Sequence, residues 1–412
     1  MNVLILAQYF PPDLGGSATR AYNVAKGLSL NGCRVTVIAA FPHYPYGKIP
    51  KEYNWKPIKL EFMDNFKVIR TFMPPVRSRG FLRRLLLIGS FAFSALFALP
   101  FVGKIDVVWT TSWVPGLVYG KLKRKPVALN VDDLTLEDIV YLGLIRKNSF
   151  ILKIAEWIYR FFYVKADVVT PISPGYIETL EGKYCVKPDR IRVVRCGVDL
   201  SKFGLNGPDS IDRDNFVILY SGAFSVGYDF DQVLLAAKRL ESYNDIVFVL
   251  QGGGELAEYL KNKVVEFGLK NVVILDKILS RDEVANFLKG AEALLLPLKD
   301  YGKPYLGFSS KLYEYQAVGK PIICCAVGQP ADYIKDTGSG VVVKPGDFEG
   351  LAKAVLFLKQ NPDAARKMGL SGRRYVEEHL SIQAIGLELK RVLEASCKSK
   401  CQFKSKTDGN VS

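Results

Sequence analysis

The feature that most constrains this chain is a repeated alternation of short, continuously apolar runs with segments of helical periodicity. Residues 2–7 (NVLILA) form an apolar run that is typical of a strand buried on both faces of a parallel sheet. Apolar residues then recur at helical spacing from Ser17 to Gly32, and residues 34–40 (RVTVIAA) read as the next strand. Because such crossovers are right-handed, this unit predicts two parallel strands joined by a helix.

The alternation occupies two separate stretches of the chain. Further strands are predicted at 106–111, 126–131 and 167–173, and the pattern restarts near residue 215. The stretch between, 201–214 (SKFGLNGPDSIDRD), is polar and contains Gly, Pro and Asp, as linkers do. With 412 residues the chain is also too long for one compact core. We therefore predict an α/β protein with two doubly wound, Rossmann-like domains.

Four segments follow from this division. We expect a first domain, a second domain, a C-terminal helix that packs back toward the first domain, and a basic, disordered tail; their predicted bounds are 1–205, 206–380, 381–396 and 397–412.

Composition limits the classes of function. Seven scattered cysteines without a C-x-x-C pair and only two histidines, His43 and His379, leave little material for a metal site. The net charge of +15 raises nucleic acid as a partner, but no nucleic-acid-binding motif is present. Much of the excess charge is clustered at 67–84, at 121–125 and at the C-terminus, which favours a membrane surface over a polynucleotide. We expect no nucleic acid as a partner.

Glycines follow several predicted strands, at the sheet edge where ligands of such folds bind. Gly15 and Gly16 lie just before a helix N-terminus, where backbone N–H groups and the helix dipole favour an anion. Turn geometry alone also explains them, and their spacing is not that of a dinucleotide fingerprint. The second half repeats the theme in SGAFSVGYD, QGGGE and GFSSK, a pattern that suits a diphosphate.

One carboxylate, Glu314, stands in the run SSKLYEYQAVGKPIICC (309–325). It lies one helical turn beyond Ser310, so its oxygens could accept hydrogen bonds from vicinal hydroxyls while the N–H groups of Ser310 and Lys311 face phosphates. A ribose diphosphate has both needs. The alternative is that an acid in the first helical turn simply complements the helix dipole.

Several runs resemble a known family of enzymes, the GT-B-fold retaining glycosyltransferases called group 1 or family 4. The resemblance rests on YFPPDLGGSATRAYNVAKGLSLNGCRVTVI, FPHYPYGK, NVDDLTLEDIVYLG, RCGVDLSKF, SRDEVANFLKGAEALLLPL and SSKLYEYQAVGKPII, in order from residue 2 to about 390. The chain looks most like the branch that builds surface polysaccharides and lipid-linked glycans. The resemblance implies two domains facing across a cleft, with a nucleotide-sugar donor held mainly by the second and an acceptor by the first.

The resemblance assigns donor-binding roles residue by residue. Glu314 matches the second acid of the family's E-x7-E pattern, which binds the ribose hydroxyls, and Gly16 and Gly222 match glycines that approach the diphosphate. Lys277 and Ile278 lie where the family's backbone meets the base. The predicted donor-binding set is Gly15, Gly16, Gly222, Lys277, Ile278, Ser309, Ser310, Lys311 and Glu314.

Departures from the family pattern fall within the same site. Leu306 occupies the place of the first acid. The usual diphosphate-clamping Arg and Lys are replaced by Ala223 and by Gly227 or Tyr228. Lys311 is the best substitute cation, with Lys299, Lys303 and Arg20 behind it.

For catalysis the sequence offers two acids, Asp133 and Glu137, which match acidic positions of the branch and could orient an acceptor hydroxyl or stabilise positive charge on the sugar. Helix capping by Asp132 or Asp133 is the alternative. No metal or other cofactor is expected, and Asp229 and Asp231, formally a D-x-D pair, precede a helix and read as an N-cap.

An apolar run from Leu85 to Val102 follows a group of arginines. A spanning helix there would interrupt one sheet, so we expect peripheral attachment to an anionic membrane surface, with a buried domain helix as the alternative. The predicted membrane or acceptor residues are Arg83, Arg84, Leu85 and Phe91. The start MNVLILAQYFPP lacks the regions of a secretory signal, so we expect a cytoplasmic protein at the inner membrane face.

The sequence thus predicts a metal-independent, retaining glycosyltransferase that moves a sugar from a nucleotide diphosphate to a glycan or polyprenyl-linked acceptor. A catalytically degenerate nucleotide-sugar-binding partner subunit and a nucleotide-sugar epimerase on the same fold remain as alternatives. The sugar, the base, the acceptor, the linkage formed and the oligomeric state are not determined by these residues.

Overall fold

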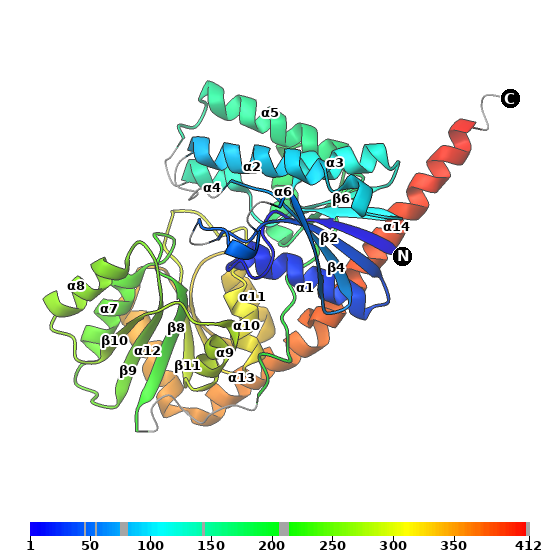
Figure 1. Cartoon of the computed structure of the whole chain (residues 1–412). Coiled ribbons are helices and arrows are strands. Elements are labelled where there is room, and N and C mark those ends of the chain that lie inside the picture. The colour runs from blue at the N-terminus through cyan, green and yellow to red at the C-terminus, as the bar shows by residue number, and fades with distance from the viewer. Residues whose placement is uncertain (45–46, 54–55, 75–80, 142–144, 206–213, 409–412) are drawn as a thin grey trace. The chain divides into compact units, whose positions relative to one another are not determined.

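The computed structural model describes residues 1–44, 47–53, 56–74, 81–141, 145–205 and 214–408, and only the backbone of 81–85 and 401–408 (Figure 1). The chain forms two compact α/β units. The first combines Met1–Gly197 with Ile382–Ser412, and the second is Val198–Ser381.

In its described part, the first unit is built on a seven-stranded sheet of order β3-β4-β2-β1-β5-β6-β7. Its strands are β1 (Asn2–Leu6), β2 (Arg34–Ala40), β3 (Ile58–Met63), β4 (Phe66–Thr71), β5 (Val107–Thr110), β6 (Val127–Val131) and β7 (Val168–Pro171). All neighbours are parallel except β3 and β4. The central strands are buried along nearly their whole length, which explains their continuous apolar runs.

Helices cover both faces of this sheet. They are α1 (Gly16–Leu30), α2 (Phe81–Leu96), α3 (Trp113–Leu122), α4 (Thr135–Tyr141), α5 (Phe150–Lys165), α6 (Ile177–Gly182) and α14 (Ile382–Asp408). Helices α1 and α14 pack together on one face, while α2, α3 and α5 form a layer on the other (Figure 1). Short 3-10 turns at Lys51–Tyr53, Leu99–Phe101, Pro174–Tyr176 and Pro188–Arg190 complete the unit.

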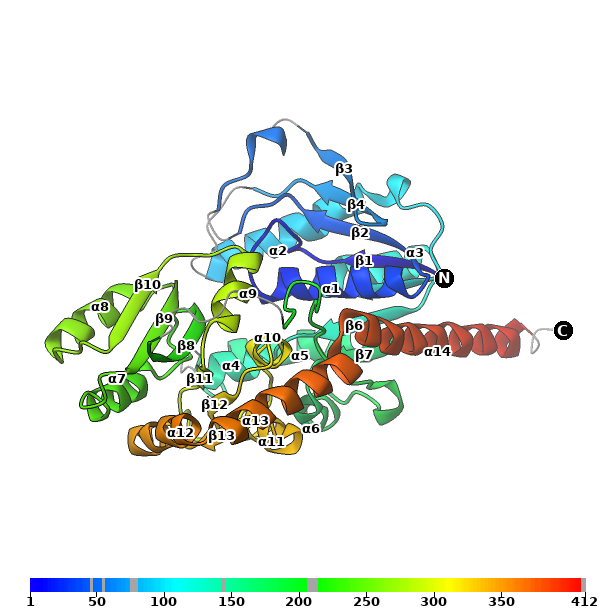
Figure 2. The same ribbon diagram turned by 90° about the horizontal axis from the view of Figure 1, so that it is seen from below.

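The second unit, in its described part, has a six-stranded parallel sheet of order β10-β9-β8-β11-β12-β13 (Figure 2). Its strands are β8 (Phe216–Ala223), β9 (Ile246–Gly253), β10 (Val272–Asp276), β11 (Ala293–Pro297), β12 (Ile322–Cys325) and β13 (Gly340–Val343). Its helices are α7 (Phe230–Arg239), α8 (Ala257–Glu266), α9 (Arg281–Lys289), α10 (Lys311–Ala317), α11 (Gln329–Thr337), α12 (Phe348–Gln360) and α13 (Pro362–Tyr375), followed by a π-helical turn at Val376–Leu380. Each of the two units is thus Rossmann-like, as the sequence predicted.

The boundary between the units lies earlier than the predicted one after residue 205. Val198 N–H donates to Leu380 O at 2.9 Å, and the buried Phe203 accepts at its carbonyl from Arg373 at 2.6 Å. These contacts attach 198–205 to the second unit. The polar composition of 201–214 indicated a linker. Composition alone does not reveal that Val198 and Phe203 are buried in the second unit.

The C-terminal end also differs from the prediction. Helix α14 does not stop at residue 396 but continues to Asp408, where a disordered tail was expected. Lys400 donates to Lys125 O at 2.9 Å and pairs with Asp167 at 3.0 Å, so this lysine of the basic C-terminal segment is held by acceptors of the first unit. The β3–β4 hairpin was not predicted, because β3 lies at the sheet edge and is only partly buried.

Helices α1 and α14 approach through two glycines. A Cβ on Gly386 would lie 2.2 Å from the carbonyl carbon of Gly27, and a Cβ on Gly27 would lie 2.5 Å from Ile382 O. Since backbone atoms on both sides form the contact, no side chain can give way.

We predict that Gly386→Ala destabilises the first unit by about 1–3 kcal/mol, because the added methyl overpacks this contact. The expected result is a lower melting temperature in differential scanning fluorimetry. Gly89→Ala is the matched control: Gly89 is an exposed glycine of α2 where an added methyl would meet no other atom within 4 Å, so the same change there should be neutral or slightly stabilising. Equal effects of the two substitutions would contradict the close packing of α1 on α14.

Candidate active site

The functional edge of the second unit lies where its strand order reverses, between β8 and β11. Glycines end the two strands on one side of this point. Gly222 has φ +151°, and a Cβ on Gly252 would lie 1.7 Å from Gly222 O. A Cβ on Gly254 would likewise lie 2.4 Å from the carbonyl oxygen of Phe224. At these positions the edge consists of close-packed backbone that leaves no room for a Cβ.

Lys311 extends across Gly222. A Cβ on Gly222 would lie 2.1 Å from Lys311 Cε, so glycine is required for this lysine to pass. Lys311 Nζ donates to the hydroxyl of Tyr228 at 3.1 Å and lies 5.1 Å from the centre of that ring. A flexible ammonium group is thus held at the end of β8, the strand whose following loop lacks the family's clamping Arg and Lys.

Buried hydrogen bonds fix the surroundings of this edge. Ser221 N–H donates to the hydroxyl of Tyr315 at 3.2 Å, which ties α10 to β8. Ser221 Oγ donates to Gln251 Oε1 at 2.6 Å, and Gln251 Nε2 donates to Lys277 O at 2.6 Å. One chain of contacts therefore links α10, β8, β9 and the segment after β10.

Glu314 lies on α10, one turn beyond Ser310, and its side chain is largely buried. Its Oε1 pairs with Arg281 of α9 at 2.7 Å, and the guanidinium of Arg281 lies 5.2 Å from the ring centre of Phe203. A carboxylate held by one arginine through Oε1 keeps lone pairs that can accept from a ligand. Glu314 and Lys311 thus lie on the same helix with separate partners, Arg281 and Tyr228.

The other predicted donor residues of this unit are more exposed. Lys277 extends its side chain toward Glu283 at 3.7 Å, so its backbone carbonyl rather than its ammonium belongs to the glycine-lined edge. The Ile278 side chain is exposed, and its Cγ1 lies 3.7 Å from the position that a Cβ on Gly253 would take. Ser309 and Ser310 lead into α10, and the carbonyl of Ser310 accepts from the N–H of Glu314 at 3.3 Å.

In the first unit, Gly15 and Gly16 stand at the start of α1, beyond the end of β1. Gly15 has φ +110°, a conformation that favours glycine, and a Cβ there would touch the ring of Tyr44 at 3.4 Å. A Cβ on Gly16 would meet no atom within 4 Å. The fold of this unit therefore requires a glycine at the first position but not at the second.

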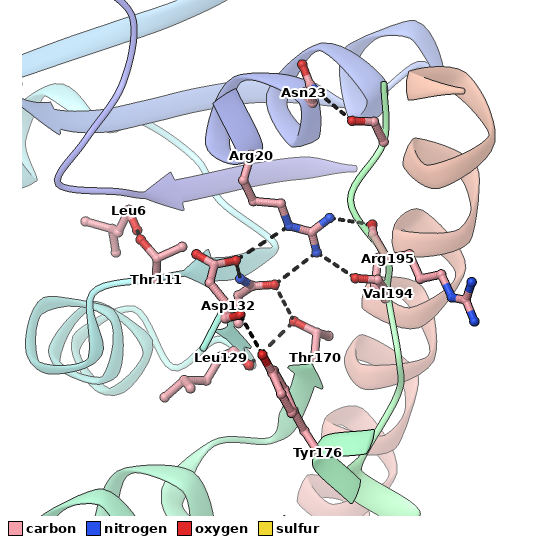
Figure 3. A network of polar contacts seen from close by, with 12 residues as sticks. Leu6, Arg20, Asn23, Thr111, Leu129, Asp132, Thr170, Tyr176, Val194 and Arg195 are labelled. Carbon is pink, nitrogen blue, oxygen red and sulfur yellow. Dashed lines mark hydrogen bonds and ion pairs between the residues drawn. The ribbon is translucent and has the colours of Figure 1, made fainter. Parts of the chain in front are cut away.

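Arg20 of α1 is at the centre of a buried polar network in the same unit (Figure 3). It donates to Val194 O at 2.7 Å, to Arg195 O and to Asn130 Oδ1 at 3.1 Å. Its Nε lies 3.8 Å from Asp132, whose carboxylate also accepts from Asn130 at 2.6 Å. Arg20 is engaged inside the first unit, so it does not serve as the reserve phosphate cation that the sequence suggested.

The acidic segment after β6 carries raised pKa values. Burial raises the pKa of Asp132 even though Arg20 opposes the shift. Desolvation, with a contribution from Asp132, raises the pKa of Asp133 to about 6, and desolvation with the charges of Asp133 and Glu137 raises that of Asp138 to about 7. Because these folded-state values exceed the usual 3.8, the acids favour the folded state at low pH, and this contribution is lost as pH rises through about 6 to 7.

Glu137, the second predicted catalytic acid, has partners of its own. Its Oε1 accepts from Lys183 at 2.8 Å, and the hydroxyl of Tyr184 lies 3.1 Å and 3.2 Å from its two oxygens. Lys183 also pairs with Glu156 of α5 at 2.7 Å. Glu137 therefore joins α4 to the segment just after α6. Asp133 keeps solvent-exposed surface at the end of β6, although enough protein surrounds its carboxyl to raise its pKa.

The D-x-D pair has helix-end roles. Asp229 accepts from the N–H of Gln232 at 3.1 Å and so caps α7, as expected, and Asp231 accepts from Tyr259 at 2.7 Å. Among the residues that the structure describes, no group of three or more His, Cys, Asp and Glu side chains is arranged to hold a metal ion.

The two halves of the chain match two known protein-family models. Residues 14–202 match the family described as Glycosyltransferase Family 4, and residues 207–375 match Glycosyl transferases group 1. The chain belongs to the group 1 and family 4 glycosyltransferases. It is therefore a glycosyltransferase of the GT-B fold, as the sequence predicted.

Individual relatives agree with this assignment. The glycosyltransferase is 26% identical over 392 residues to the putative colanic acid biosynthesis glycosyl transferase WcaI of Escherichia coli strain K12, covering 88% of this chain and 94% of that protein. It is 23% identical over 401 residues to O-antigen chain mannosyltransferase C of Escherichia coli, covering 92% and 94%. Sucrose-phosphate synthase of Thermosynechococcus elongatus has the same fold, with a TM-score of 0.74, 18% identity and coverage of 96% and 98%.

One predicted membrane residue of the glycosyltransferase is placed wrongly. Phe91 of α2 is 1% exposed, and its side chain packs into the core with Leu87 and Ala95, so it cannot contact a membrane. The side chains of Arg83, Arg84 and Leu85 lie outside the described residues. No helix in the described part of the chain is long and apolar enough to cross a bilayer.

Sequence reasoning missed three residues of these edges: Arg281, Tyr228 and Asp138. Arg281 stands in the quoted run SRDEVANFLKG but shows no local sign that it pairs with Glu314, which lies more than thirty residues away. Tyr228 was noted only as a replacement for a lost cation. The adjacency of Asp138 to Glu137 was a visible signal, because clustered acids raise one another's pKa.

We predict that the Asp133 carboxyl of the glycosyltransferase titrates near pH 6 in a carbon-detected NMR titration. Asp132→Asn should lower this pKa, because it removes a neighbouring negative charge. Asp276→Asn, in the other unit, is the control and should leave it unchanged. A value near 4 in the unmodified protein would contradict the desolvated environment of Asp133.

Proposed function

We propose that this glycosyltransferase is a retaining enzyme that transfers a sugar from a nucleoside diphosphate sugar to a glycan or polyprenyl-linked acceptor in the synthesis of a surface polysaccharide. The names of the two Escherichia coli relatives, in colanic acid and O-antigen synthesis, support the glycan product. The observation that carries the donor assignment is the placement of Lys311 over Gly222 together with the Arg281-bound carboxylate of Glu314 on the same helix.

Each member of this trio has a role that its chemistry suits. The ammonium group of Lys311 would neutralise the diphosphate, since the loop between β8 and α7 (224–229) contains no Arg or Lys. Glu314 would accept from the ribose hydroxyls with the lone pairs that Arg281 leaves open. Backbone at Gly222 would approach the phosphates, and the segment at Lys277 and Ile278 would face the base.

The proposed reaction exchanges two bonds at one sugar carbon. The bond from the anomeric carbon to the β-phosphate oxygen breaks, and the bond to the acceptor oxygen forms on the same face. The acceptor proton passes to the leaving phosphate oxygen. In this scheme the protein positions the reactants and stabilises charge, with Lys311 at the leaving group and Asp133, more than Glu137, as the acid that orients the acceptor.

We also propose that no metal takes part and that the acceptor is met at the cytoplasmic surface of a membrane. The helix-end roles of Asp229 and Asp231 support the first proposal. The clustered basic residues of the first unit support the second.

The test is a thermal-shift screen of the whole protein against UDP, GDP, ADP and TDP, with magnesium and with EDTA. We expect one nucleotide to raise the melting temperature equally under both conditions. A shift that requires magnesium would overturn the metal-free proposal. Binding without turnover of any matching donor sugar, with glycan or lipid-linked acceptors supplied, would overturn the enzymatic proposal for this site.

Glu314→Gln should weaken binding of the nucleotide selected by that screen by about 1–3 kcal/mol, the range for a lost charge-assisted hydrogen bond. Isothermal titration calorimetry measures the effect. Glu258→Gln, an exposed acid of α8, is the matched control and should have none. Arg281→Met breaks the ion pair but keeps the carboxylate, so it should cost less affinity than Glu314→Gln. Equal losses would indicate that Glu314 acts only through its contact with Arg281.

Gly16→Ala tests the first unit's part in donor binding. The added methyl meets no other protein atom within 4 Å, so the free energy of unfolding should change by no more than about 0.5 kcal/mol. The melting temperature should therefore stay nearly the same. Donor affinity should nevertheless fall about tenfold or more, because the methyl would keep the diphosphate away from the backbone. Gly182→Ala, at another open position, is the control. Unchanged donor affinity would remove Gly16 from the donor site.

A further inference from the structure

Helix α5 exposes an apolar stripe along its whole length. Phe150 is 76% exposed and Trp157 is 68% exposed, and between and beyond them stand Ile151, Ile154, Ile158, Phe161 and Val164. Their spacing of three, four and seven residues places them on one side of the helix. Such a stripe normally faces a protein core, yet here it faces outward.

The opposite side of α5 is also apolar and is already used. Leu152 and Tyr163 are buried, and the ring of Tyr159 packs edge-on against Trp113 of α3 at 4.2 Å between ring centres. Helix α5 is thus apolar on two opposite sides, whereas a surface helix usually carries a single apolar stripe. The inner side binds α5 to its own unit, so the outer stripe is available for another apolar phase.

Helix α2 adds to this surface. It belongs to the same helical layer as α5, on the face of the sheet opposite α1 and α14 (Figure 1). Leu86, Ile88 and Phe93 of α2 are exposed, and so are Phe97 and Phe101 beyond the end of the helix. We call the exposed apolar residues of α2, α5 and the turn at Leu99–Phe101 the outer apolar face. The number of exposed apolar side chains on these elements is well above the single, scattered hydrophobic residues usual on a protein surface.

The charged residues of α5 and of the segment just before it are almost all positive. Arg146 and Lys147 precede the helix, Lys153 and Arg160 line one edge of its apolar stripe, and Lys165 ends it. The one acid within α5, Glu156, is paired at 2.7 Å with Lys183, which directly follows α6. Apolar and aromatic side chains bordered by Lys and Arg are the pattern of a helix that lies in the interface of an anionic bilayer.

We propose that the outer apolar face docks on an anionic lipid bilayer, with α5 lying in the plane of the interface and Trp157 and its neighbours inserted among the acyl chains. This inference rests on the proposed function, in which the enzyme meets its acceptor at a membrane surface. It adds which face of the protein binds and which lipids that face binds. Both helices have 16 residues, so α5 lies on the bilayer rather than across it. A second copy of the chain is a poorer occupant, since it would bring the basic borders of two α5 helices together.

The test mixes the full-length protein with vesicles of phosphatidylcholine alone or of phosphatidylcholine with phosphatidylglycerol. We expect flotation with the anionic vesicles only, and weaker flotation at high salt. Tryptophan emission should shift to the blue on binding, because Trp157 is exposed whereas Trp109 is buried. Trp157→Phe should keep flotation but lose most of the shift.

The variant that tests the surface is Ile154→Ser with Trp157→Ser. Loss of two exposed apolar anchors should lower vesicle partitioning about tenfold or more. The matched control is Val265→Ser with Leu370→Ser, two exposed apolar residues of α8 and α13 in the other unit, which should leave partitioning unchanged. Melting temperatures check that all variants fold.

Three outcomes would overturn the inference. The first is no binding to anionic vesicles, and the second is binding that the α5 double variant leaves intact. The third is a concentration-dependent dimer, seen by light scattering, that the double variant abolishes, which would assign the face to a second copy. Nucleotide-induced stabilisation with no vesicle binding would leave the donor proposal standing and remove only this one.

Discussion

The buried guanidinium of Arg20 is the constraint on which the functional edge of the first unit depends. A charge removed from water must find acceptors, and Arg20 finds them on Val194, Arg195, Asn130 and Asp132. Two of these acceptors belong to β6 and the loop after it, and two belong to the segment that leaves this unit at Gly197. One side chain therefore fixes both the start of the acidic loop and the path of the chain out of the unit.

The second unit is organised by close approaches of backbone rather than by a buried charge. Gly222 and Gly252 leave no room for side chains, and Lys311 uses the space above Gly222 to bring its ammonium group to the end of β8. A cation from α10 thus stands near a strand end that lacks the family's usual ones. Arg281 then holds Glu314 in place on the same helix. In the proposed function, these contacts would supply the positive charge and the acceptor that a bound nucleoside diphosphate needs.

The helical layer of α2, α3 and α5 illustrates how far hydropathy can be used. The sequence indicated that the segment around α2 is unusually apolar, and it is, but Phe91 points into the core while Phe93 and Phe97 are exposed. The larger exposed stripe lies on α5, which sequence reasoning did not single out. Apolar residues at helical spacing indicate that a helix has an apolar side. They do not reveal whether that side faces the sheet or the solvent, because this depends on which neighbours cover it.

The sequence by itself determined the α/β class, the two-domain division, the order of most strands and helices, and the glycine-rich and acidic strand ends, because these depend on local periodicity and backbone propensity. The tertiary structure decided the boundary at Gly197, the helical C-terminus, and the partners of Arg20, Glu137, Glu314 and Lys311. Arg20 looked like a spare ligand for phosphate and is an internal tie instead. The physical reason is that each of these contacts joins residues distant in the chain, and the free energy that selects them comes from desolvation and packing in the assembled unit.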